Sequence, residues 1–272
     1  MNTTPPFLEH TNLTSHRIYS NKLVLKSTRQ TYKAGLCLCQ LPKTSDYLAL
    51  LPHLHPQELD YYKALPVEKR KKSYSIGRYS AKKALSALIG ERNLKNTFID
   101  RGLFDHPIVV NPNNQNIQVS ISHCDDIGAA LAFPEALPMG IDVERVDPDK
   151  KEVIESQMTE DEKELIKSFS CSYSTLLVLL WTVKEALSKI LKTGLTFPFK
   201  ISEISGLTGN QDTLVCNFKN FAQYKGVSFN LGGYMHSIVF PKNTEIQFNF
   251  NALKNKFHYK RPSDEHNLGE CF

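Results

Sequence analysis

One long apolar helix constrains the fold of this chain more than any other feature. Between Thr175 and Lys192, apolar side chains return at three- and four-residue intervals, and Gly194 follows just beyond the predicted end. A helix of this length extends roughly 27 Å at 1.5 Å per residue. Its leucine-rich side has to be buried, so the sequence predicts that it spans a lobe and packs against another layer.

Strands are predicted before and after this helix, where apolar residues alternate or run together. A second helix is predicted from Pro66 to Gly90, and Thr159 to Glu162 forms the Thr-x-x-Glu pattern of a helix-capping box. The predicted strands cover residues 34–41, 119–123, 127–133, 139–146, 227–240 and 245–250. Helices and strands mixed in this way predict an α+β fold.

The length of 272 residues suits one large domain or two lobes. The segment 134–140, with its prolines and glycine, is the predicted boundary between lobes, and the sequence contains no internal repeat. Both ends are polar and are expected to be frayed. We therefore expect an N-terminal extension (1–30), an N-terminal lobe (31–136), a C-terminal lobe (137–250) and a C-terminal tail (251–272).

Composition and charge exclude several classes of protein. Hydrophobic residues make up 41% and charged residues 22%, which is ordinary for a globular chain and excludes fibrous or disordered ones. The longest apolar run, Leu176 to Trp181, is far shorter than the ~20 residues that cross a bilayer. With no secretory leader evident, we expect a cytoplasmic protein without a membrane partner. The net charge of +5 is too small for a dedicated nucleic-acid binder and fits an acidic partner or substrate.

Several familiar sites are also absent from the sequence. The six cysteines include no C-x-x-C pair, which predicts reduced thiols and no structural zinc. Neither G-x-x-x-x-G-K-[ST] nor G-x-G-x-x-G occurs, so the usual phosphate-binding loops are missing. Ser122 and His123 are neighbours on a predicted strand and point to opposite faces, which argues against a serine hydrolase. Phosphate binding would have to come from a basic stripe on the helix predicted at 66–90 (Lys71, Arg78, Lys82) and from a metal ion.

Three acidic residues are candidates for that metal site. Asp142 and Glu144 project from one face of a predicted strand, while Ile141 and Val143 project from the other. A divalent cation would relieve the repulsion between the two carboxylates, although a solvated strand face explains the pair equally simply. On the long helix, Trp181, Lys184, Glu185, Ser188 and Lys189 share one face, where an ordinary exposed i,i+4 ion pair is the plain alternative. If Glu185 joins the pair, the three carboxylates form a hard oxygen site suited to Mg²⁺.

Taken together, these motifs resemble the 4′-phosphopantetheinyl transferases of the two-lobed, surfactin-synthetase-activating type. The resemblance lies in Ile121-Ser122-His123, then Gly140-Ile141-Asp142-Val143-Glu144, then the helix segment Trp181-Thr182-Val183-Lys184-Glu185-Ala186-Leu187-Ser188-Lys189. Asp142 and Lys184 are 42 positions apart, close to the family's spacing of about forty. The basic helix at 68–82 and the turn at 192–195 also fit, so the resemblance extends from about residue 65 to 200.

The resemblance implies a fold and a reaction. It implies two similar α/β lobes related by pseudo-twofold symmetry, with coenzyme A between them, in a monomer. The implied enzyme moves 4′-phosphopantetheine from coenzyme A to a serine of an acidic apo acyl or peptidyl carrier protein and releases adenosine 3′,5′-bisphosphate. Because the nucleophile belongs to the carrier, the chain itself needs no activated serine or cysteine.

The resemblance also assigns roles to individual residues. Asp142, Glu144 and Glu185 would bind Mg²⁺, and Glu185, or a water it orients, would be the general base. Lys189 would stabilise the leaving phosphate, and Ser122 and His123 would contact the adenosine 3′-phosphate. The further residues expected to bind coenzyme A are Lys69, Lys72, Arg78, Lys82, His106 and Lys184.

Two alternatives from other classes stay open at this point. A catalytically silent module that only binds carrier proteins would have no need of the three carboxylates and Lys189. A magnesium-dependent phosphohydrolase of coenzyme A would need a further His or Asp near the motifs to activate water.

One departure from the family pattern yields a test. Family members usually carry Gly-Lys-Pro before the Ser-His strand, where this chain reads Asp105-His106-Pro107. An unperturbed histidine is mostly neutral at pH 7, so we expect weaker coenzyme A binding here. The substitution His106→Lys should lower the dissociation constant for coenzyme A, measured by titration calorimetry. An unchanged constant would count against this assignment of His106.

Overall fold

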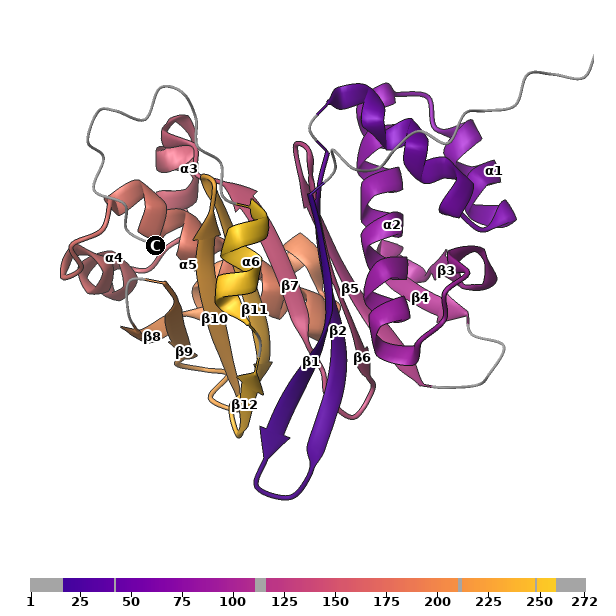
Figure 1. Cartoon of the computed structure of the whole chain (residues 1–272). Coiled ribbons are helices and arrows are strands. Elements are labelled where there is room, and N and C mark those ends of the chain that lie inside the picture. Colours follow the sequence, from indigo (N-terminus) through magenta and orange to yellow (C-terminus); the bar gives the residue numbers. More distant parts are fainter. Residues whose placement is uncertain (1–16, 42, 111–115, 210–211, 248, 258–272) are drawn as a thin grey trace, which may run out of the picture.

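The structure, a computed structural model, describes residues 17–41, 43–110, 116–209, 212–247 and 249–257. It consists of two lobes, each with a sheet covered on its outer face by helices, and the two sheets face each other (Figure 1). The predicted α+β architecture is therefore confirmed. No helix in these residues is long and apolar enough to cross a membrane. The fraying predicted for the two ends concerns residues 1–16 and 258–272, which lie outside the described part of the chain.

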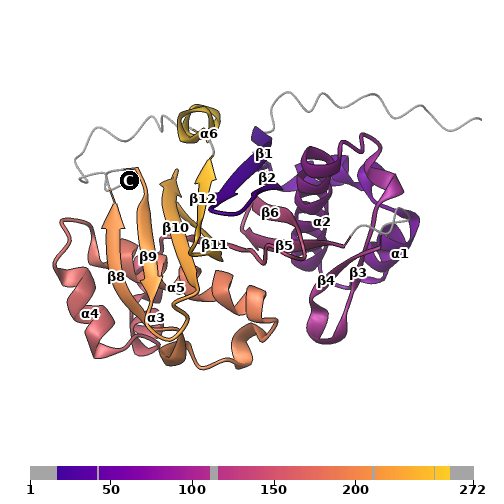
Figure 2. The same cartoon turned by 90° about the horizontal axis from the view of Figure 1, so that it is seen from below.

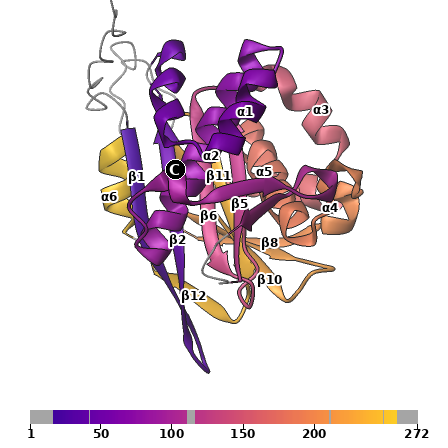
Figure 3. The same cartoon turned by 90° about the vertical axis from the view of Figure 1, so that its right-hand side faces the viewer.

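The N-terminal lobe is built on an antiparallel sheet in the order β12-β1-β2-β6-β5, with β3 and β4 as a separate pair. Helix α2 lies across the outer face of the sheet (Figure 3). Its elements are β1 (Arg17–Ser27), β2 (Thr31–Gln40), α1 (Pro56–Ala64), α2 (Glu68–Ile89), β3 (Phe98–Arg101), β4 (Pro107–Val110), β5 (Ile117–Cys124) and β6 (Ile127–Pro134). The predicted helix at 66–90 is confirmed, and Gly90 ends it in the left-handed conformation with φ 81°.

The C-terminal lobe is built on an antiparallel sheet in the order β7-β11-β10-β9-β8, covered by α5. Its elements are β7 (Gly140–Arg145), α3 (Lys151–Ser156), α4 (Glu160–Lys167), α5 (Tyr173–Leu191), β8 (Ile204–Gly209), β9 (Leu214–Phe218), β10 (Tyr224–Leu231) and β11 (Tyr234–Pro241). The chain then returns to the N-terminal sheet with β12 (Thr244–Gln247) and α6 (Phe250–Phe257). Helix α5 confirms the long apolar helix. The predicted capping box is also present, since Thr159 Oγ1 accepts from the Glu162 amide and Glu162 accepts from the Thr159 amide.

The same contacts recur in both lobes, although the sequence shows no repeat. A glycine lets each helix cross its strand closely: a Cβ at Gly35 on β2 would lie 1.9 Å from the Ala84 carbonyl oxygen. A Cβ at Gly140 on β7 would lie 1.9 Å from the Ala186 carbonyl oxygen. The order of elements after these strands is also similar: α1 and α2 precede β3 to β6 in one lobe, and α3, α4 and α5 precede β8 to β11 in the other. The two lobes are thus similar, as predicted, while the pseudo-twofold relation between them stays a prediction.

Each lobe also contains one fully buried ion pair in the same place. Lys82 on α2 pairs with Glu58 on α1 at 2.9 Å, and Lys184 on α5 pairs with Glu162 on α4 at 2.7 Å. The glutamates make matching bonds, accepting from the Ile99 amide at 2.9 Å and from the Ile204 amide at 2.8 Å respectively. Each pair therefore ties a short helix, a long helix and a strand together.

The facing sheets enclose a shared apolar core. Leu36 and Leu38 of β2 and Ile141 and Val143 of β7 are all fully buried in it. Because this core draws on both sheets, neither lobe can separate without exposing it.

The two chain ends are more structured than the sequence predicts. Strand β1 pairs along β2, although its residues fall in the predicted extension 1–30. Strand β12 belongs to the predicted C-terminal lobe yet pairs with β1 in the N-terminal sheet. Helix α6, in the predicted tail, buries Leu253 and Phe257 in the shared core and lies beside β1 (Figure 2). The predicted boundaries at 31 and 251 are therefore wrong, because β1 is part of the N-terminal sheet and α6 packs on the shared core.

The buried ion pairs predict a clear stability effect. The substitution Lys82→Met leaves Glu58 charged and without its counter-ion, which should lower the free energy of unfolding by about 3–5 kcal/mol. The matched control is Lys83→Met, next in sequence but partly exposed, which should change it by about 0.5 kcal/mol or less. Urea unfolding followed by circular dichroism measures both. Equal effects of the two substitutions would contradict a stabilising role for the pair.

Candidate active site

Strand β7 presents its acidic residues to α5, as predicted. Asp142 and Glu144 alternate with Ile141 and Val143, which point into the shared core. Only 4% of Asp142 is exposed, whereas the Glu144 side chain keeps about a third of its surface in solvent, at 32%. The alternation of a strand thus places two carboxylates in the space between β7 and the long helix.

Helix α5 reaches the same place through Lys189. Its ammonium group donates to Asp142 Oδ1 at 2.8 Å and to the Ile141 carbonyl at 2.8 Å. Glu185 lies one turn earlier on the helix and interacts electrostatically with Asp142, Glu144 and Lys189. The predicted catalytic pair and the predicted strand carboxylates are therefore in one site.

Strand β5 of the other lobe completes the surroundings of Asp142. The Ser122 hydroxyl donates to Asp142 Oδ1 at 2.7 Å across the boundary between the lobes. Oδ1 thus receives two hydrogen bonds, while the buried Oδ2 has no hydrogen-bond partner among the described residues. A buried carboxylate oxygen without a donor is costly, and it marks a place where a cation could bind.

Burial and neighbouring negative charge raise the pKa values of Glu185 and Glu144. Burial raises the pKa of Glu185 to about 7, and the negative charge of Asp142 adds to the shift, while Lys189 opposes it. Burial and Asp142 also raise the pKa of Glu144. The site therefore carries excess negative potential, which favours a positively charged ligand.

The chemistry of these donors fits a magnesium ion, but no ligand cluster is preformed. Carboxylate oxygens are the ligands that Mg²⁺ prefers, and Asp142 Oδ2 is free to take part. Within the described residues, however, no three His, Cys, Asp or Glu side chains lie close enough to hold a metal ion together. Asp142, Glu144 and Glu185 thus form one electrostatic cluster, and their joint ligation of a metal stays a prediction.

His123 lies on the side of α2, on the face of β5 opposite to that of Ser122. A Cβ on Gly77 of that helix would lie 3.8 Å from His123 Cδ2. The packing around its ring lowers the pKa of His123, and the nearby Lys189 adds to this effect. The predicted opposition of Ser122 and His123 is confirmed, so the two residues serve different parts of the site.

The basic residues of α2 differ in their access to solvent. Lys69 is exposed and Lys72 partly exposed on the first turns of the helix. Arg78 is 7% exposed, and its guanidinium lies over the Tyr74 ring at 5.1 Å. The Arg78 Nε has no hydrogen-bond partner in the described structure. These three residues remain candidates for binding a phosphate group.

Two of the predicted coenzyme A ligands are wrong. Lys82 and Lys184 are fully buried in the ion pairs described above, where Lys82 also donates to the Leu94 carbonyl and Lys184 to the Phe199 carbonyl. Their ammonium groups are buried and paired inside each lobe, so they cannot reach a ligand between the lobes. Their role is structural.

His106 lies in the turn between β3 and β4. Its Nδ1 is 2.6 Å from the Leu103 carbonyl oxygen within the same turn. The structure places it on the N-terminal lobe, and its contact with coenzyme A stays a prediction.

Two residues of β5 were missed by the sequence analysis. The Ser120 hydroxyl accepts from the Ile141 amide at 3.1 Å, and Cys124 Sγ lies 3.7 Å from Glu144 Oε2. Both stand two positions from Ser122 and so share its face of the strand. The alternation of Ser120, Ser122 and Cys124 was the available signal.

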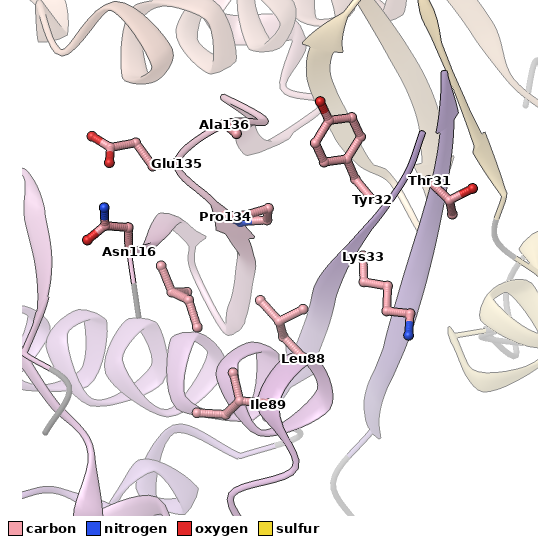
Figure 4. A pocket seen from close by; sticks show the side chains of 10 residues that line it. Thr31, Tyr32, Lys33, Leu88, Ile89, Asn116, Pro134, Glu135 and Ala136 are labelled. Atoms are coloured by element: carbon pink, nitrogen blue, oxygen red, sulfur yellow. The ribbon is translucent and has the colours of Figure 1, made fainter. Parts of the chain in front are cut away.

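A large cavity lies elsewhere in the N-terminal lobe. Its volume is about 1020 Å³, and it is lined by the last turn of α2, the start of β2 and the end of β6 (Figure 4). Leu88, Tyr32 and Pro134 face it, and none of the predicted catalytic residues is in its lining. It is separate from the carboxylate site.

One protein-family model matches the part of the chain that contains the carboxylates. Residues 138–239, which contain β7, α5 and all three carboxylates, match the family model of the 4′-phosphopantetheinyl transferase superfamily. This segment of the C-terminal lobe is therefore similar to that superfamily. The matched segment carries Asp142, Glu144, Glu185 and Lys189 together. The narrower surfactin-synthetase-activating type stays a prediction.

Among solved structures, the chain is similar to a holo-(acyl-carrier-protein) synthase from Bacillus anthracis str. Ames, solved in complex with CoA (3′,5′-ADP). The two share 19% sequence identity, and the similarity covers 41% of this chain and 96% of the synthase, with a TM-score of 0.34. No curated protein matches this chain.

The electrostatics of the carboxylate site predict how the pKa of Glu185 changes when a neighbouring charge is removed. In the metal-free protein, Asp142→Asn removes a negative charge, so the pKa of Glu185 should fall from about 7 toward its ordinary value of 4.5. Lys189→Met removes a positive charge and should raise it further. Carbon-13 NMR of labelled glutamate carboxyls measures both, in the presence of a chelator. A pKa of Glu185 that is the same in both variants would contradict the proposed cluster.

Proposed function

We propose that this protein transfers 4′-phosphopantetheine from coenzyme A to a serine of an acidic apo carrier protein, with Mg²⁺, releasing adenosine 3′,5′-bisphosphate. The observation that carries the proposal is the site between β7 and α5. There Asp142 is held by Lys189 while Glu185 and Glu144 add negative charge. This site lies within the segment matched by the transferase family.

In the proposed reaction, the carrier serine oxygen attacks the phosphorus atom that carries pantetheine. A new P–O bond forms, and the bond from that phosphorus to the bridging oxygen of the pyrophosphate breaks. The bridging oxygen leaves with adenosine 3′,5′-bisphosphate. Mg²⁺ held by Asp142, Glu144 and Glu185 would neutralise the charge that builds on the pyrophosphate.

The remaining steps fall to the side chains of the site. Glu185, or a water it orients, accepts the proton of the serine hydroxyl. Its pKa of about 7 in the metal-free protein is high enough for a base that works near neutral pH. Lys189 lies on the same helix face and presents its ammonium group to the leaving phosphate oxygens.

Coenzyme A would be held mainly by the N-terminal lobe. His123 lies on the α2 side of the site, and Lys69 and Lys72 at the start of that helix carry exposed or partly exposed charges. These groups would bind the adenosine 3′-phosphate. The half-exposed Lys150, beside Glu144, would be available to the acidic carrier protein.

Incubation with coenzyme A, Mg²⁺ and an apo carrier protein tests the proposal. A carrier whose mass rises by one phosphopantetheine group supports it. Release of adenosine 3′,5′-bisphosphate without a carrier would instead indicate a phosphohydrolase. Complex formation without chemistry would indicate a silent carrier-binding module.

The acidic residues should be essential for transfer. Glu185→Gln should lower kcat by roughly 10²–10⁴-fold because it removes the general base, and Asp142→Ala should abolish transfer because it removes a metal ligand. The matched control Glu164→Gln changes an exposed glutamate on α4 and should leave kcat unaltered. Circular dichroism checks that each variant is folded. Turnover at the wild-type rate in Glu185→Gln or Asp142→Ala would remove that residue from the proposed site.

A further inference from the structure

The two sheets meet edge to edge at the site, at β5 and β7. Strand β5 is the last strand of the N-terminal sheet, and β7 is the first strand of the C-terminal sheet. Side chains of β5, and not its backbone, satisfy the outward-facing amides of β7. The two edges are thus joined by a side-chain ladder that consists of Ser120, Ser122 and Cys124.

Each member of this ladder meets a different part of β7. The Ser120 hydroxyl accepts from the Ile141 amide at 3.1 Å, and the Ser122 hydroxyl accepts from the Val143 amide at 3.3 Å. Ser122 alone also contacts Asp142, donating to Oδ1 at 2.7 Å. Both serine hydroxyls therefore accept a hydrogen bond from a backbone amide of β7, and of the two only Ser122 also donates to the Asp142 carboxylate.

The hydrogen-bonding capacity of Ser122 limits what else it can do. A serine hydroxyl has one proton, and that proton is used on Asp142. Phosphate oxygens of a bound nucleotide are acceptors, so Ser122 could donate to one only by releasing Asp142. Because Ser122 is also 8% exposed, its oxygen has little access to a ligand.

The bond from Ser122 also determines which oxygen of Asp142 is free. Lys189 and Ser122 both donate to Oδ1, one from each lobe, and together they hold the carboxylate. Oδ2 is left buried and without a partner in the described structure. Hydrogen bonds from residues that do not themselves bind the metal orient a metal-binding carboxylate in this way.

We infer that Ser122 is a positioning residue that fixes Asp142 for metal binding, and that it does not bind the adenosine 3′-phosphate. The phosphate contact predicted for the Ser-His pair then belongs to His123 alone. This inference rests on the proposed function for its catalytic consequence. The contact between Ser122 and Asp142 is testable without it.

A double-mutant cycle tests the contact. Urea unfolding gives the free energies of unfolding of Ser122→Ala, Asp142→Ala and the double variant. A matched control cycle uses Ser120→Ala instead of Ser122→Ala. We expect the effects of Ser122→Ala and Asp142→Ala to be non-additive, and those of Ser120→Ala and Asp142→Ala to be additive. Additivity in the first cycle would overturn the inference whether or not the protein is a transferase.

Metal binding and donor choice test the role. Ser122→Ala should weaken Mn²⁺ binding to the free protein by roughly 10–100-fold, measured by electron paramagnetic resonance, while Ser120→Ala should not. Ser122→Ala should also lower kcat/KM, and the loss should be equal for the two donors coenzyme A and 3′-dephospho-coenzyme A. Unchanged Mn²⁺ binding, or a loss of kcat/KM that disappears with the dephosphorylated donor, would overturn the inference and assign Ser122 to the phosphate. Absence of transfer by the wild-type protein would contradict the proposed function instead and leave the unfolding cycle decisive.

Discussion

The buried carboxylate of Asp142 links the two lobes through hydrogen bonds and lies where we propose that the metal ion binds. It receives a charged hydrogen bond from Lys189 of the C-terminal lobe and a hydroxyl bond from Ser122 of the N-terminal lobe. A carboxylate that is 4% exposed needs such partners, because the loss of water around it is otherwise expensive. The same contacts fix the distance between β7, α5 and β5. The group that we propose to bind the metal therefore also holds the three elements around it together.

The rest of the fold supports this arrangement by using one device in each lobe. A glycine, Gly35 on β2 or Gly140 on β7, lets the long helix approach its sheet, and a buried lysine–glutamate pair fixes that helix to a shorter one. In the C-terminal lobe the paired residue, Lys184, is directly followed by Glu185. The ion pair therefore fixes the rotation of α5 and, with it, the direction in which Glu185 and Lys189 face. A rigid scaffold of this kind is what a site with several repelling charges requires.

Local periodicity explains what could be predicted from the sequence. The long helices, the capping box at Thr159 and the opposite faces of Asp142 and Val143 all follow from spacing within one element. The predictions for Lys82 and Lys184 were wrong because the spacing of a lysine on a helix does not show whether its ammonium group is in solvent or paired with a glutamate of another helix. Helix α6 was missed because its burial depends on residues distant in the sequence, such as Phe229. Strand β1 pairs with its neighbour β2, and it was missed because its segment was assigned to a polar, frayed terminus. The function of Ser122 required the geometry across the lobe boundary.

The measurement that tests the central claim most directly is a crystal structure of the protein with coenzyme A and Mn²⁺, using anomalous scattering to locate the metal. The account predicts a metal peak between β7 and α5, with Asp142 Oδ2 and a Glu185 oxygen as ligands and the pyrophosphate beside it. A peak remote from Asp142, or a pyrophosphate bound away from α5, would contradict it.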